Sequence, residues 1–178
     1  GTGATVAKLG GSERGVKGGI GSAAITLSTG QTVAAAVAVN AVGGIFDHTN
    51  GQLLAGPRRA DGGLGDSVAM LLTGESNSPA GPVNTTIGLV ATDALITKED
   101  ANYLARVSHD GLALTIRPCH TVRDGDSMFA MATGHNRSDV DLTSLGAAAV
   151  EATARAVLRA VRTATGLGGI PSISELVA

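Results

Sequence analysis

The tripeptide Asn84-Thr85-Thr86 places two hydroxyl side chains directly before the apolar run "IGLVA". One interpretation is an ordinary turn that leads into a buried β-strand over residues 86–92. The other is nucleophilic chemistry, because a threonine hydroxyl attacks carbonyls once a base removes its proton. A threonine at the start of a chain has such a base in its own α-amine, whose pKa is about 8. Cleavage of the bond before Thr85 would create that terminus.

The segment before this tripeptide, residues 56–83, reads as a long exposed connection with one short helical piece around residues 66–72. Loops of this length in a compact domain are usually functional or disordered. A new chain end formed at Asn84 would therefore have room to move away from the nucleophile.

A second polar cluster, "RPCHTVRDGDSMFA" at residues 117–130, also stands before an apolar segment. Asp124 and Asp126 flank a glycine, which suits a charged turn, a metal site or a catalytic carboxylate pair. A metal site would use both aspartates with His109 or His120, but a third spaced carboxylate or a His-x₃-His pair is missing. The pattern alone favours the turn.

Other residues with polar or reactive side chains have less distinctive surroundings. Lys8 and Lys17 are by default surface lysines. Asn40 ends an apolar run, and a polar amide at the end of a buried strand needs hydrogen-bond partners. We expect His109 on a helix surface or in a structural hydrogen bond, and Cys119 as a small buried apolar residue.

The glycine-rich start of the chain resembles nucleotide-binding loops only superficially. "GGSERGVKGG" lacks the Gly-Lys-Ser/Thr ending of a phosphate-binding loop. The pattern Gly19-x-Gly21 is followed by a predicted strand, where a dinucleotide-binding site requires a helix. Neither nucleotide interpretation is supported.

Composition excludes several classes of function. The 178 residues carry 13 basic and 15 acidic side chains and three aromatic residues, so a nucleic-acid surface is not expected. Cys119 is the lone cysteine, which excludes an intrachain disulfide. No apolar run is long enough for a membrane span, and we find no signal-peptide pattern, so a cytoplasmic protein is the default expectation.

The periodicity predicts one domain in which strands and helices form separate runs, which favours an α+β fold. We expect a hairpin with strands at 23–28 and 32–40, joined by a turn at Thr29 and Gly30, and a buried strand at 127–133. A capping box at Thr97 and Asp100 opens a helix over 98–116. A second helix over 143–165 has a stripe of buried small residues and outward arginines: Leu145, Ala149, Ala152, Ala156 and Ala160, with Arg155, Arg159 and Arg162 towards solvent.

Three separated motifs, "GTGATVAKLGG…VKGGIGSA", "NTTIGLVATDALI" and "HDGLALTIRPCHTVRDGDSMFAMATG", resemble the DmpA-type aminopeptidase family. That family includes L-aminopeptidase/D-esterases, β-peptidyl aminopeptidases and the nylon-oligomer endo-hydrolase. Threonine with Asp-Gly-Asp is most similar to the nylon-oligomer hydrolase branch, because the aminopeptidase branch often has serine and glutamate at these positions.

The resemblance implies a four-layer αββα sandwich like that of the N-terminal-nucleophile hydrolases and of ornithine acetyltransferase. It implies self-cleavage between Asn84 and Thr85, giving residues 1–84 and 85–178. Family members carry a long segment before "GTGATV", so we expect residues 1–178 to be the C-terminal half of a longer precursor. A homo-oligomer, as a tetramer, is also implied.

The resemblance further implies the role of each candidate site residue. Thr85 would be the nucleophile, Lys8 would lie beside it, and Asn40 would donate to the oxyanion. Asp124 and Asp126 would complete the polar network. Neither a cofactor nor a metal ion is implied.

The expected function is hydrolysis of amide bonds in small peptides or linear amide oligomers through an acyl-enzyme. Two alternatives stay open. One is acyl transfer of the ornithine acetyltransferase type, although the Ala-Thr cleavage dipeptide usual in that enzyme is missing here. The other is an inactive structural relative that is never cut.

Overall fold

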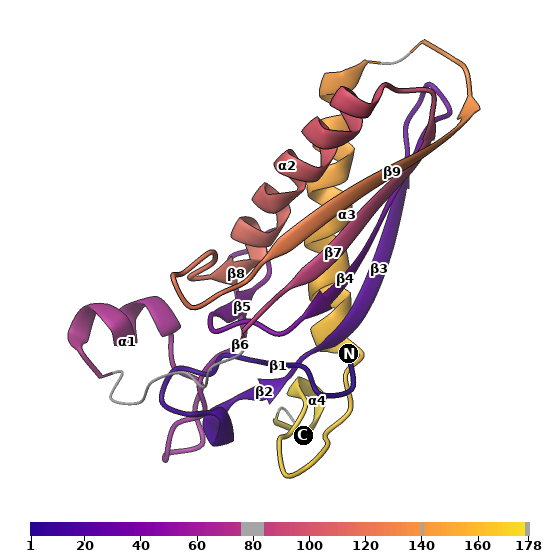
Figure 1. Ribbon diagram of the computed structural model, residues 1–178. Coiled ribbons are helices and arrows are strands. Elements are labelled where there is room, and N and C mark those ends of the chain that lie inside the picture. The colour runs from indigo at the N-terminus through magenta and orange to yellow at the C-terminus, as the bar shows by residue number, and fades with distance from the viewer. Residues whose placement is uncertain (76–83, 140, 177–178) are drawn as a thin grey trace.

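The computed structural model describes residues 1–75, 84–139 and 141–176, and its centre is a mixed four-stranded sheet (Figure 1). The strands lie in the order β3-β4-β7-β9. Their bounds are Gly19–Thr26 for β3, Thr32–Val39 for β4, Ile87–Ala94 for β7 and Ser127–Asn136 for β9. The first three strands pair antiparallel, whereas β7 and β9 run parallel and are joined through a helix. The largely antiparallel sheet confirms the α+β class, although strands and helices do not form the separate runs that we expected, because α2 lies between β7 and β9.

Two long helices cover one face of this sheet: α2, Lys98–Thr115, and α3, Leu142–Arg162 (Figure 1). The predicted capping box opens α2, where the side chains of Thr97 and Asp100 each accept a hydrogen bond from the other's backbone amide. The predicted stripe of small residues on α3 is buried and the three arginines are exposed, as expected. The helix ends at Arg162, three residues before the predicted end.

The glycines before the hairpin belong to a strand, so the prediction that β3 begins at residue 23 is wrong. β3 begins at Gly19, which lies against α3. A Cβ on Gly21 would lie 2.2 Å from the carbonyl oxygen of Ala156, and one on Gly19 would lie 2.7 Å from that of Ala160. Glycine is required there because backbone meets backbone. The Gly-x-Gly pattern is a packing feature of the sheet and helix.

Shorter elements surround the end of the sheet at which β7 begins (Figure 1). β1 and β2 form a small antiparallel pair, and β5 pairs with both β6 and β8. Their bounds are Thr5–Val6 for β1, Val16–Lys17 for β2, Gly44–Phe46 for β5, Leu53–Ala55 for β6 and Ile116–Arg117 for β8. A 3₁₀ turn covers Ser12–Arg14, and α4 covers Ile173–Leu176.

The predicted short helical piece is α1, Ser67–Thr73, which Asp66 caps. The segment around it is less exposed than predicted, because Gly56, Pro57 and Gly65 are buried. Residues 76–83 of the expected long loop lie outside the described part of the chain.

The two strands predicted to be buried, β7 and β9, are buried on one face only. Side chains that point to α2 and α3 are enclosed, such as Val90 at 0% exposure. The opposite face carries exposed apolar residues: Ile20, Ile87, Leu89, Phe129 and Met131. A continuous apolar run predicts a strand in a sheet that is covered on both faces, but the described residues cover one face of this sheet. None of the described helices is long and apolar enough to cross a membrane.

Candidate active site

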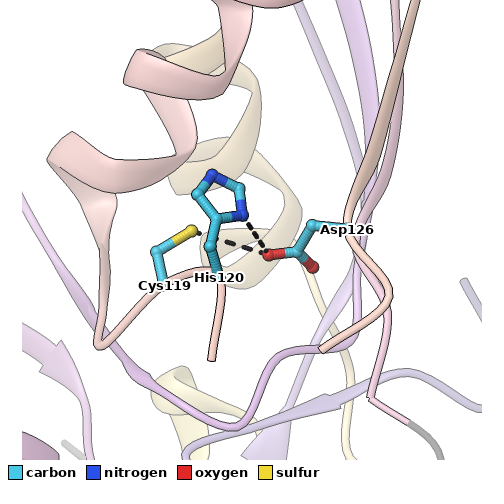
Figure 2. Close-up of side chains that lie close together, drawn as sticks. All are labelled: Cys119, His120 and Asp126. Atoms are coloured by element: carbon cyan, nitrogen blue, oxygen red, sulfur yellow. Dashed lines mark hydrogen bonds and ion pairs between the residues drawn. The ribbon is translucent and has the colours of Figure 1, made fainter. Parts of the chain in front are cut away.

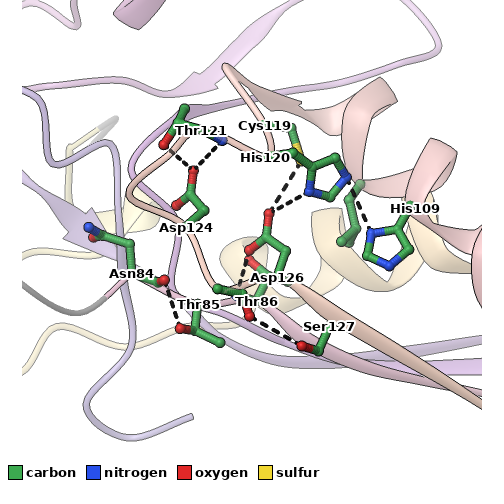
Figure 3. A network of polar contacts seen from close by, with 12 residues as sticks. Asn84, Thr85, Thr86, His109, Cys119, His120, Thr121, Asp124, Asp126 and Ser127 are labelled. Carbon is green, nitrogen blue, oxygen red and sulfur yellow. Dashed lines mark hydrogen bonds and ion pairs between the residues drawn. The ribbon is translucent and has the colours of Figure 1, made fainter.

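The candidate site lies where the parallel pairing of β7 and β9 continues beyond the ends of both strands. Asn84 forms a bridge with Asp124, and the amide of Ser127 donates to the carbonyl of Thr86 at 2.9 Å. The tripeptide 84–86 and the Asp-Gly-Asp turn therefore lie side by side (Figure 3). Thr86 and Asp126 are 40 positions apart in the sequence, and α2 lies between them.

The hydroxyl of Thr85 lies against the peptide bond that precedes it (Figure 3). Thr85 Oγ1 donates to the carbonyl oxygen of Asn84 at 2.7 Å. The backbone amide of Gly125 donates to the same oxygen at 2.8 Å, and the amide of Thr85 donates to the carbonyl of Asn40 at 2.9 Å. The Asn84 carbonyl is therefore held by an N–H donor that would also stabilise negative charge on its oxygen.

Gly125 leaves just enough room for the hydroxyl. A Cβ on Gly125 would lie 2.9 Å from Thr85 Oγ1, closer than such contacts occur in proteins, and 3.8 Å from the carbonyl oxygen of Asn84. The backbone of Gly125 does not have a positive φ, so an alanine would be tolerated by the main chain. Its lack of a side chain matters because of the hydroxyl in front of it.

Gly125→Ala is therefore expected to slow reactions of the Thr85 hydroxyl by about 100-fold, the typical cost of a displacement near 1 Å at a reacting group. The variant keeps the amide donor, so the loss would report the position of the hydroxyl. The measurement is the rate at which the intact chain is converted to fragments, followed by mass spectrometry. Gly3→Ala is the matched control, because a Cβ at Gly3 meets nothing within 4 Å. Equal rates for both variants would contradict this account.

Asn40 links Thr85 to Lys8. Its carbonyl accepts the amide of Thr85, and its side-chain Oδ1 accepts Lys8 Nζ at 2.8 Å and the amide of Thr5 at 3.1 Å. These two donors determine the orientation of the Asn40 amide group, since Oδ1 is its acceptor. The polar end of the β4 strand is thus satisfied, as the sequence required.

The expectation that Lys8 and Lys17 are surface lysines is wrong. They are 4% and 5% exposed. Lys17 Nζ donates to the carbonyl of Thr2. Burial lowers the pKa of Lys8 to about 8, and the negative charge of Asp124 opposes that shift. At pH near 8, about half of the Lys8 side chains would then be neutral amines able to accept a proton.

Asp124 is held by the turn that contains it. Its Oδ2 accepts the amide of Thr121 at 3.1 Å and the Thr121 hydroxyl at 2.7 Å, and its Oδ1 accepts the amide of Val42 at 3.5 Å. The turn interpretation is thus confirmed. The turn positions the carboxylate, and the carboxylate interacts with the charge of Lys8.

Asp126 holds the backbone immediately after Thr85. Its Oδ1 accepts the amide of Thr86 at 2.8 Å, and its side chain is 3% exposed. The other oxygen, Oδ2, lies 3.0 Å from His120 Nδ1 and 3.6 Å from Cys119 Sγ (Figure 2). The Cys119 thiol is therefore not a purely apolar residue as predicted, because it donates to a carboxylate while packing against the core.

Cys119, His120 and Asp126 bring three potential metal ligands within 4.8 Å of one another. A metal would require the thiolate, but burial and the charge of Asp126 raise the pKa of the Cys119 thiol. The protonated thiol and the imidazole N–H are instead donors to the same carboxylate oxygen. The chemistry of this donor set fits a hydrogen-bond network better than a metal centre.

The structure brings together all five residues that the resemblance implied. Lys8, Asn40, Thr85, Asp124 and Asp126 lie in one network of contacts through Asn40 and the Asp-Gly-Asp turn. Gly125 and Thr121 were not assigned a role from the sequence, and His120 was considered there only as a possible metal ligand. Thr121 could have been found, because Thr-x-x-Asp is a recognised turn and capping pattern. The role of Gly125 could not have been found from the sequence. It depends on the contact of Gly125 with Thr85, which is close in space but distant in the chain.

Comparison with known proteins places the chain among peptidases. The model of "Peptidase family S58" matches residues 1–172. An aminopeptidase of Mycobacterium leprae, itself uncharacterized, is 40% identical over 176 residues, which are 88% of this chain and 48% of that protein. A 6-aminohexanoate-oligomer endohydrolase of Kocuria is 33% identical over 90 residues, 44% of this chain and 25% of that enzyme. The chain thus spans about half the length of the curated relatives that it matches along most of its own length.

Solved structures show the same fold. A β-aminopeptidase of Burkholderia has a TM-score of 0.61 at 24% identity, covering 94% of this chain and 51% of that one. An L-aminopeptidase D-Ala-esterase/amidase of Ochrobactrum anthropi, described as a variant of the Ntn hydrolase fold, has a TM-score of 0.57 at 21% identity, covering 94% and 50%. The expected N-terminal-nucleophile-hydrolase-like fold is confirmed. The described residues supply one sheet layer and one helical layer of it.

Proposed function

The chain belongs to peptidase family S58, and from this membership and the geometry of the site we propose that it is a self-processing amide hydrolase with Thr85 as nucleophile. The observation that carries the proposal is the contact of Thr85 Oγ1 with the carbonyl of Asn84, whose oxygen also accepts the amide of Gly125. A hydroxyl, a scissile carbonyl, an oxyanion donor and a base, here Lys8, are the groups that self-cleavage needs.

In the first reaction, Thr85 Oγ attacks the carbonyl carbon of Asn84 while neutral Lys8 takes the hydroxyl proton. The negative charge that develops on the carbonyl oxygen is stabilised by the Gly125 amide. The bond between the Asn84 carbon and the Thr85 nitrogen then breaks, and the nitrogen receives the proton. Water hydrolyses the resulting ester, leaving a carboxylate on Asn84 and a free amine on Thr85.

In the second reaction, the new α-amine of Thr85 replaces Lys8 as the base for the Thr85 hydroxyl. Thr85 Oγ attacks the amide carbonyl of a substrate, the α-amine moves the proton to the leaving amine, and water hydrolyses the acyl-enzyme. Asn40 donates to the oxyanion, a contribution that typically lowers the barrier by about 2.7–4 kcal/mol. Asp124 maintains the charge balance of Lys8, and Asp126 holds the backbone of Thr86.

The substrates that we propose are small peptides or linear amide oligomers, in keeping with the names of the aminopeptidase and endohydrolase relatives. Both classes need a nucleophile and an oxyanion donor but no cofactor. A homo-oligomer remains a prediction from the family resemblance, which light scattering on the purified protein would test.

The proposal is tested by measuring the intact mass of the purified protein and the N-terminal residue of its fragments. We expect a 94-residue fragment, residues 85–178, whose first residue is Thr85. The processed protein should release amines from amino-acid amides, β-peptides or aminohexanoate oligomers. An uncut chain without hydrolase activity would contradict the proposal and favour an inactive relative. Product formation only with an added amine acceptor would favour acyl transfer.

A further inference from the structure

We infer that His120 is a positioning residue that holds Asp126 against the backbone of the nucleophile, an inference that rests on the proposed function. His120 Nδ1 lies 3.0 Å from Asp126 Oδ2. Asp126 Oδ1 accepts the Thr86 amide at 2.8 Å. One carboxylate thus bridges an imidazole and the peptide group that follows Thr85 (Figure 3).

The donor and acceptor roles in this chain of contacts follow from chemistry. An ionised carboxylate only accepts, so His120 must donate from Nδ1. A carboxylate with only one oxygen bound can rotate about its Cβ–Cγ bond, whereas binding both oxygens prevents that rotation. His120, as the stronger of the two donors to Oδ2 beside the weakly donating Cys119 thiol, therefore sets where Oδ1 lies, and Oδ1 determines where the Thr86 amide lies.

The backbone of His120 is strained in a way that suits this role. Its φ of 54° is in the left-handed region, and among the described non-glycine residues only Ala7 shares that feature. A residue other than glycine in the left-handed region is strained, and such a conformation persists where the surrounding structure requires it. Here the conformation aims the imidazole of His120 back at Asp126 from the turn that leads into β9.

A second histidine orients the imidazole from its other side. His109, on α2, has its Nδ1 3.3 Å from His120 Nε2. The tautomers of the two rings determine which of these nitrogens donates in the contact. Burial, and after it the neighbouring His120, lowers the pKa of His109. The charged and thiol groups around the pair are Asp110, Asp126 and Cys119.

Three substitutions separate the side chain of His120 from its backbone conformation. His120→Asn keeps an N–H donor near the position of Nδ1 and tolerates a left-handed φ. His120→Gly keeps the backbone conformation and removes the donor. His120→Ala loses both. We expect self-cleavage and hydrolysis to fall about 10- to 100-fold in His120→Gly, the usual cost of a lost hydrogen bond to a charged group, and further in His120→Ala. His120→Asn should remain within a few-fold of the natural protein.

A second readout reports the geometry without using activity. In Thr85→Ala protein, the NMR resonance of the Thr86 amide should shift and its hydrogen exchange should accelerate when His120→Gly is added. Both should return towards their original values with His120→Asn. His135→Asn, at an exposed histidine on β9, is the control and should change neither. This measurement does not depend on whether the chain cleaves itself.

The two proposals fail in different ways. An unchanged Thr86 amide in His120→Gly, or equal losses in the Gly and Asn variants, would overturn the role of His120 and leave Thr85 as the nucleophile. Continued cleavage in Thr85→Ala would overturn the proposed function, while a displaced Thr86 amide would still establish the contact through Asp126.

Discussion

Thr85→Ala is expected to leave the chain uncut and to abolish hydrolase activity. The substitution removes the single atom that makes the covalent bond in both proposed reactions, and such losses reach roughly 10⁴-fold or more. The hydroxyl lies 2.7 Å from the carbonyl oxygen of Asn84, so nothing else in this contact can replace it. Mass spectrometry of the purified variant should show the intact chain and no 94-residue fragment beginning at residue 85.

Thr85→Ser is the matched control, because it keeps the hydroxyl and removes only a methyl group. Its cleavage and hydrolysis should both persist. Circular dichroism should show that the alanine variant is folded, since Thr85 is only partly buried and is not part of the hydrophobic core. A fragment starting at residue 85 in folded Thr85→Ala protein would exclude Thr85 as the nucleophile.

Lys8→Met is expected to slow self-cleavage by roughly 10²- to 10⁴-fold, the usual contribution of a general base. Methionine has a similar length and suits the buried position, which is 4% exposed. The change removes the amine that Asn40 holds through Oδ1, while Thr5 still donates to the same oxygen. Slower self-cleavage in Lys8→Met should therefore reflect the missing proton acceptor more than a change in packing.

The pH dependence of self-cleavage gives a signature for Lys8. The neutral amine is the base, and burial lowers the pKa of Lys8 to about 8. Below that pH, the neutral fraction and the cleavage rate should rise about tenfold per pH unit, and above it the rate should level off. No α-amine exists at residue 85 before the cut, so this rise cannot come from Thr85. The precursor can be made by short cell-free synthesis and transferred to buffers from about pH 6 to 9.5.

Lys17→Met is the control for this experiment. Lys17 is equally buried, at 5% exposure, and its Nζ binds the carbonyl of Thr2 and not Asn40. It should keep both the cleavage rate and its pH dependence. If Lys8→Met cleaved with an unchanged rise towards pH 8, another group would be the base.

The local elements of this fold could be predicted because their signals lie within a few residues of one another. Thr97 and Asp100, three residues apart, form a capping box that predicts the start of α2. The stripe of small residues on α3 repeats every helical turn. Asp66 marks the start of α1 in the same way. The hydroxyl before β7 could also be recognised, since Asn84 and Thr85 are adjacent.

The assembly of the site depended on contacts between distant parts of the chain. Thr86 and Asp126 are 40 residues apart, and Lys8 and Asn40 are 32 apart. These pairs meet because β7 and β9 pair in parallel and because β1 and β2 fold across the end of β4. Strand order is not encoded in any local pattern, so residue spacing alone could not distinguish the Asp-Gly-Asp turn from an ordinary one.

The amino-acid sequence by itself determined the helices, the hairpin, the position of the hydroxyl and, through three motifs, the resemblance to a family of aminopeptidases. Only the tertiary structure decided that Lys8 is buried with a lowered pKa, that Gly125 faces the hydroxyl, and that His120 reaches Asp126. The physical reason is that periodicity and capping are properties of neighbouring residues. Burial, close approach and pKa depend on what the rest of the chain brings to the same place.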